Sequence, residues 1–91
     1  LMRRIIRGSE PHWIAGHRPD SASIKCAAKT RYRQSDQPCR LSYQSNHSIN
    51  VQFDYAQRAM TPGQSVVLYD GEIVLGGATI CAPDDASVAT N

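Results

Sequence analysis

The residues of this 91-residue sequence best suited to chemistry are four cations at odd-numbered positions, two or four residues apart. They lie in the stretch KCAAKTRYRQ, residues 25–34, as Lys25, Lys29, Arg31 and Arg33. If one strand runs from residue 23 through Gln34, these odd-numbered residues project from the same face, with neighbours two residues apart separated by about 6.6 Å. Ammonium and guanidinium groups can bind phosphate oxygens, and a guanidinium does so through two parallel hydrogen bonds. The pattern predicts a strand that binds a nucleic-acid backbone, with Gln34 adding a contact to a base edge or a sugar.

The same stretch also fits an ordinary solvated strand face. A half-buried strand needs polar residues on its outer side, and Lys or Arg on an edge strand discourages pairing with other chains. In this interpretation Tyr32 is a core aromatic residue with its hydroxyl at the rim. Composition alone leaves both interpretations open.

Charge is divided unevenly along the chain. Residues 1–40 hold nine Lys/Arg and three Asp/Glu, whereas residues 41–91 hold one Lys/Arg and five Asp/Glu. Local potential, rather than the overall charge of +2, steers association with a charged partner. The division favours a polyanion partner for one surface only.

No set of residues predicts catalysis or metal binding. Cys26, Cys39 and Cys81 match no disulfide framework or zinc spacing, and we interpret them as reduced, mostly buried thiols. His12 and His17 lack an accompanying Cys-x-x-Cys pair. We therefore predict no catalytic residue and no metal ligand in this chain.

Short alternating segments dominate the sequence and predict strands. In SINVQFD, residues 48–54, Ile49, Val51 and Phe53 alternate with polar residues, so one face is core and the other is solvated. About six such strands separated by turn residues predict an all-β protein, a small closed or nearly closed antiparallel β-barrel. Barrel closure removes the exposed edges that a small sandwich leaves.

Three glycine-containing sequences predict how these strands connect. Thr61-Pro62-Gly63-Gln64 fits a type II turn. The dipeptide Asp70-Gly71 predicts a type I′ hairpin turn between two β-branched runs. Gly76-Gly77 predicts a bulge or bend in the returning strand.

The chain length predicts one domain. We assign residues 12–81 to the barrel, residues 1–11 to an N-terminal linker or cloning remnant, and residues 82–91 to a flexible tail. No apolar run approaches the roughly 20 residues that span a bilayer, and the basic start is too short of apolar residues for a signal peptide. We expect no membrane partner.

Three segments together resemble the C-terminal domain of the bacterial tRNA-specific 2-thiouridylases, also called tRNA-uridine 2-sulfurtransferases. They are HWIAG at 12–16, KTRYRQSDQPC at 29–39 and RAMTPGQSVVLYDGEIVLGGATI at 58–80. The resemblance implies a β-barrel attached to a cytoplasmic, ATP-dependent enzyme that thiolates the wobble uridine of tRNA.

The resemblance places the chemistry outside this chain. The family's ATP-binding loop and its two catalytic cysteines lie in earlier domains, so ATP with Mg is implied for the parent enzyme and no cofactor for this fragment. The implied partners are tRNA, near its anticodon arm, and the parent's N-terminal catalytic and central domains. The alternative is a barrel for interdomain or protein–protein contact without direct RNA binding.

Overall fold

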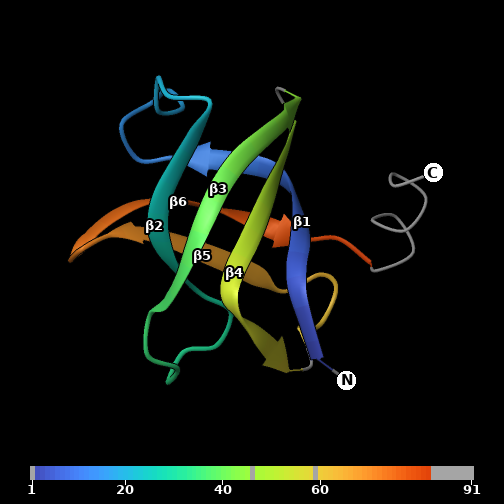
Figure 1. Ribbon diagram of the computed structural model, residues 1–91. Coiled ribbons are helices and arrows are strands. Elements are labelled where there is room, and N and C mark those ends of the chain that lie inside the picture. The colour runs from blue at the N-terminus through green and yellow to red at the C-terminus, as the bar shows by residue number, and fades with distance from the viewer. Residues whose placement is uncertain (1, 46, 59, 83–91) are drawn as a thin grey trace.

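The computed structural model is a closed antiparallel barrel of six strands, which confirms the predicted fold class. The structure describes residues 2–45, 47–58 and 60–82. The strands are β1 (Met2–Trp13), β2 (Ser23–Lys29), β3 (Gln37–Ser45), β4 (Ser48–Arg58), β5 (Ser65–Asp70) and β6 (Ile73–Ile80). Their order around the barrel is β1-β4-β3-β2-β5-β6, and β6 pairs back onto β1. In Figure 1, β2, β3, β4 and the first part of β1 lie in front of β5 and β6, and the last part of β1 bends behind β3 and β4.

The barrel begins at Met2, so the assignment of residues 1–11 to a linker is wrong. The strand was missed because its inward positions include Gly8, where a larger apolar residue would have marked the pattern. A Cβ atom at Gly8 would lie 2.9 Å from that of Ala78, so the close packing of β1 requires glycine there. Of the predicted tail, residues 83–91 lie outside the described part of the chain.

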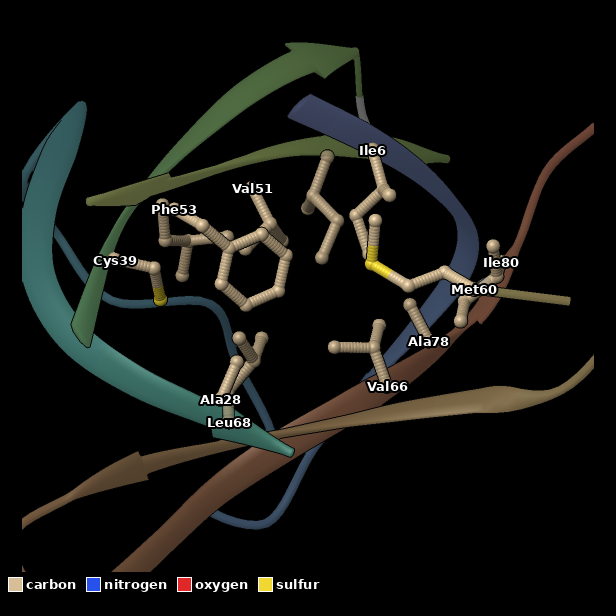
Figure 2. Close-up of a cluster of buried hydrophobic side chains, with 12 residues drawn as sticks. Ile6, Ala28, Cys39, Val51, Phe53, Met60, Val66, Leu68, Ala78 and Ile80 are labelled. Carbon is tan, nitrogen blue, oxygen red and sulfur yellow. The ribbon is translucent and has the colours of Figure 1, made fainter. Parts of the chain in front are cut away.

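Inward-facing side chains of the strands meet in one core (Figure 2). Ile49, Val51 and Phe53 on β4 are almost fully buried, as their alternation predicts. The other members of the core come from all five remaining strands and from Met60: Ile6, Ala28, Cys39, Leu41, Met60, Val66, Leu68, Ala78 and Ile80. Burying such side chains stabilises the fold by about 1.5–3 kcal/mol for each large residue.

The turns follow the predicted glycines, with one correction. Gln64 N donates to Thr61 O at 3.2 Å and Gly63 has φ +89°, which confirms the type II turn. The β5–β6 hairpin is centred on Gly71-Glu72 rather than Asp70-Gly71. Positive φ occurs at Gly71 and not at Glu72, so the predicted type I′ turn is wrong and the backbone matches type II′.

Backbone contact at the β1–β6 seam explains one of the paired glycines. A Cβ atom at Gly76 would overlap the carbonyl oxygen of His12 on β1. Beside this contact the β1–β6 register shifts between Ser9 and His12, and Glu10 in that interval has φ +50°. The β5–β6 register also shifts next to Gly76, at the level of Leu75. The predicted irregularity is therefore present, and it lies where the barrel closes.

The described residues form no helix that is long and apolar enough to span a bilayer.

Candidate nucleic-acid interface

The predicted cationic strand is interrupted at Lys29. Strand β2 ends there, residues 30–36 form a loop, and Gln34 N donates to Arg31 O across a turn at 3.2 Å. The prediction that one strand continues through Gln34 is therefore wrong. Lys25 and Lys29 lie on the outer face of β2, whereas Arg31 and Arg33 lie in the loop, which we call the cationic loop (residues 30–36). In Figure 1 this loop joins the lower ends of β2 and β3.

The cationic loop is held to the barrel by a network of side-chain amides. Gln34 Oε1 accepts from the backbone N of Thr30 at 3.0 Å and from its hydroxyl at 3.3 Å. Gln34 Nε2 donates to Gln57 Oε1 at 2.9 Å, and Gln57 Nε2 donates to Gln37 Oε1 at 3.1 Å. Gln57 is only 6% exposed, so these bonds satisfy amides away from water. The predicted RNA contact of Gln34 stays a prediction, and both ends of its amide are engaged within the protein.

The tip of the cationic loop presents Arg31, Tyr32 and Arg33 to solvent. Arg31 Nη2 donates to the carbonyl oxygen of Arg58 at 3.1 Å, which ties the tip to the end of β4. Tyr32 is 93% exposed, so the interpretation of this residue as a core aromatic is wrong. The turn carries the tyrosine away from the inward face that the alternation assigned to it.

The outer face of β2 and β3 carries a second pair of exposed cations. Lys25 lies directly opposite Arg40 in the β2–β3 register. Like charges at opposing positions destabilise a sheet, so this pair favours an anion above it. Arg40 was missed as a site residue because it is 15 positions from Lys25 in sequence. The feature that could have identified Arg40 is the register of the β2–β3 hairpin. This register pairs Cys26 with Cys39 and therefore Lys25 with Arg40.

Carboxylates leave most of these cations free. Lys29 Nζ lies 3.5 Å from Asp36 Oδ1 and 5.5 Å from the centre of the Tyr69 ring. Within residues 2–45, 47–58 and 60–82, ion pairs involve Lys29 and His47 but none of the other candidates: Lys25, Arg31, Arg33 and Arg40. Phosphate oxygens can therefore reach these four cations without displacing an acidic partner.

Of the three cysteines, only Cys39 is buried in the core, and Cys26 packs against it half-buried. Cys81 follows β6 and is also half-buried. Cys26 and Cys39 are paired across β2 and β3 with their sulfur atoms 3.6 Å apart. The contact with Cys26, together with burial, raises the pKa of Cys39, and the hydrogen bond from Cys39 lowers the pKa of Cys26. In the part of the chain that the structure describes, no group of three or more His, Cys, Asp or Glu can hold a metal ion.

An apolar groove lies between the segment after β1 and the start of β6. Its apolar lining comes from seven residues: Trp13, Ile14, Ala15, Pro19, Ile73, Val74 and Leu75. The side chains of Ile14 and Ile73 are 65% and 67% exposed. Clustered apolar side chains that remain exposed are typical of a contact surface.

Comparison with known proteins identifies similar sequences. The model of the family described as the aminomethyltransferase beta-barrel domain matches residues 3–80. The chain is 49% identical to the tRNA-specific 2-thiouridylase MnmA of Xanthomonas campestris pv. campestris and 51% identical to that of Stenotrophomonas maltophilia, each over 84 residues. Each match covers 92% of this chain and 22% of the relative, so the chain spans about a fifth of the length of these relatives.

Proposed function

This chain belongs to the aminomethyltransferase β-barrel domain family, and on that basis we propose that it is the C-terminal barrel of a tRNA 2-thiouridylase and helps to bind and position tRNA. The observation that carries the proposal is the set of exposed cations on the cationic loop and on the outer face of β2 and β3. Among the described residues, four of these cations have no carboxylate partner: Lys25, Arg31, Arg33 and Arg40. Contacts to phosphate position a nucleic acid and need clustered cations of this kind.

The surface offers two places for phosphate. Arg31 and Arg33 project from the end of the barrel, and Lys25 and Arg40 lie on its outer face further along β2. Lys29, between them along the chain, shares its charge with Asp36 and makes a weaker phosphate contact. An RNA backbone that follows β2 towards the cationic loop meets both places, and we expect the anticodon arm to be the part that lies there.

The parent enzyme's chemistry takes place in its other domains. We expect the remaining four fifths of such a protein to bind ATP with Mg and to carry out the thiolation. The barrel alone then performs no thiolation. The cytoplasm, where tRNA is modified, is the expected compartment.

The experiment is a titration of fluorescently labelled tRNA with this chain at low and moderate salt. About three phosphate contacts give a log–log salt slope near −2, using the value for single strands. An Arg31→Ala/Arg33→Ala double variant is expected to lose most of the binding. An Arg4→Ala/Arg18→Ala double variant removes the same charge from β1 and from the segment before β2, and is expected to retain it.

The control variant separates a site from general charge. Equal weakening by both double variants contradicts the assignment of RNA binding to the cationic loop. If the wild-type chain binds no tRNA at any salt concentration, the barrel does not hold RNA by itself, and the alternative function is favoured.

The apolar groove supports that second function, a contact surface for the rest of the longer protein. The observation in favour of this function is the exposure of Ile14 and Ile73. Two neighbouring apolar side chains in water do not stabilise an isolated barrel, whereas a protein partner would bury them. The two functions use different surfaces and are compatible with each other.

A further inference from the structure

Tyr32 is the most exposed large hydrophobic residue among those that the structure describes, at 93%. A tyrosine ring that faces water forgoes the favourable burial that makes aromatic residues valuable in cores and interfaces. A single exposed aromatic residue is common on protein surfaces and proves little. Two features set Tyr32 apart: the way its backbone is held and the charged groups that surround its ring.

The backbone that carries Tyr32 is fixed on both sides. Before it, Arg31 is bonded to the end of β4, and after it, Gln34 is bonded to Thr30 and to the buried Gln57. The turn bond from Gln34 N to Arg31 O closes the tip itself. A ring on such a turn loses little conformational freedom when a ligand covers it, because the loop is ordered beforehand.

The chemistry beside the ring selects the kind of ligand. Arg31 and Arg33 flank Tyr32, and within the described residues neither has a carboxylate at ion-pair distance. Arg31 donates one hydrogen bond to the carbonyl oxygen of Arg58 and keeps its other N–H groups for a ligand. An aromatic face between two guanidinium groups without carboxylate partners among the described residues fits a nucleotide that has left its stack. The base covers the ring, and the two neighbouring phosphates face the arginines.

We propose that Tyr32 stacks against one unpaired base of bound RNA, while Arg31 and Arg33 contact the phosphates on either side of that nucleotide. The proposal rests on the proposed function, that the barrel holds RNA. It goes further by predicting that a loop or single-stranded segment, rather than a helix, meets the tip of the cationic loop. Bases within a duplex are covered by their neighbours and cannot lie on the ring.

The test compares binding of this chain to a short single-stranded RNA and to the same sequence closed in a duplex, at one low salt concentration. Tyr32→Ala is expected to weaken binding to the single strand by about 5-fold or more, the range found when a stacking residue is truncated. Tyr32→Phe keeps the ring and is expected to bind like the wild type. Ile14→Ala removes an exposed apolar side chain beyond the other end of β2 and is expected to change nothing.

Two further measurements identify stacking directly. The salt slope of Tyr32→Ala is expected to equal that of the wild type, because its phosphate contacts remain. A single strand carrying 2-aminopurine is expected to show a fluorescence change on binding to the wild type and to Tyr32→Phe, and a much smaller one with Tyr32→Ala.

The outcomes separate this inference from the proposed function. One outcome is RNA binding that is unchanged in Tyr32→Ala but lost in Arg31→Ala/Arg33→Ala. It would overturn stacking by Tyr32 and keep the RNA-binding function. The exposed ring of Tyr32 would then be assigned to a contact with protein. Equal weakening by Tyr32→Phe and Tyr32→Ala overturns stacking as well, because the hydroxyl is then the contact. A wild-type chain that binds neither tRNA nor a single strand overturns both proposals.

Discussion

The cationic loop and the apolar groove are built in opposite ways. The loop is held outside the barrel by side-chain amides, with Gln57 at their centre, and it exposes charge. The groove lies beside the β1–β6 seam, where backbones touch at Gly76, and it exposes apolar surface. The RNA-holding and protein-contact interpretations looked like alternatives in the sequence, and in the structure each has a surface of its own.

The largest expected effect tests the seam. Gly76→Ala forces a methyl group against the carbonyl oxygen of His12, and we expect it to lower the free energy of unfolding by about 3 kcal/mol. Gly16→Ala is the control, because Gly16 has φ +90° but open space around it, so only backbone strain of about 1 kcal/mol is expected. Denaturant unfolding measures both variants. If both variants lose the same unfolding free energy, the close approach of β1 and β6 at Gly76 adds nothing to the cost of the substitution.

The next effect tests the amide network that holds the cationic loop. Gln57→Leu leaves the amides of Gln34 and Gln37 without their partner, and we expect a loss of about 2 kcal/mol in unfolding free energy. We also expect faster hydrogen exchange at the backbone amide of Thr30 and weaker RNA binding, although Gln57 is buried. Gln52→Ala, an exposed change on the same strand, is the control. Unchanged exchange at Thr30 in Gln57→Leu would mean that the network does not order the loop.

A smaller effect tests whether the two surfaces are independent. Ile73→Asp places a charge in the groove, and we expect a stability change within about 0.5 kcal/mol because the residue is largely exposed. RNA affinity of the isolated chain is expected to stay the same. In a longer protein that carries this barrel, the same substitution is expected to loosen the barrel from its neighbouring domains, detectable as faster proteolytic release of the barrel. If Ile73→Asp lowers the RNA affinity of the isolated chain, the groove and the cationic loop do not act independently.

The smallest effect concerns the reactivity of Cys26, which is expected to be independent of both the cationic loop and the apolar groove. The hydrogen bond from Cys39 lowers the pKa of Cys26, so more of Cys26 is thiolate at a given pH. Cys39→Ala removes this bond, raises the pKa of Cys26 and is expected to slow its alkylation near pH 8 a few-fold, as measured by mass spectrometry. Substitutions at Tyr32 or Ile73 are expected to leave the alkylation rate unchanged. A faster reaction of Cys26 in Cys39→Ala would contradict the direction of this pKa shift.

Local sequence pattern predicted the barrel and misplaced parts of the interface, for identifiable reasons. Alternation along β4 and the turn at Pro62-Gly63 depend on neighbouring residues, so the sequence reveals them. The loop at 30–36 depends on Gln57, 23 positions after Gln34, and no local pattern shows that contact. The Lys25–Arg40 pair likewise depends on the register of two strands. Lys25, Arg31 and Arg33 are exposed and Lys29 is half-buried, and the division of these residues between a strand face and a loop tip required the fold.

The seam between β1 and β6 also governs when the barrel can form. It joins the first and last strands of the barrel, β1 and β6, with Gly8 opposite Ile80. Contacts between residues so far apart in sequence form slowly. During synthesis β1 can pair with β4 first, but it cannot pair with β6 until Ile80 has left the ribosome. Until then the free edges of β1 and β5 can pair with other chains. The nascent barrel is therefore most vulnerable to aggregation just before its last strand emerges, and chaperone protection would matter most in that interval.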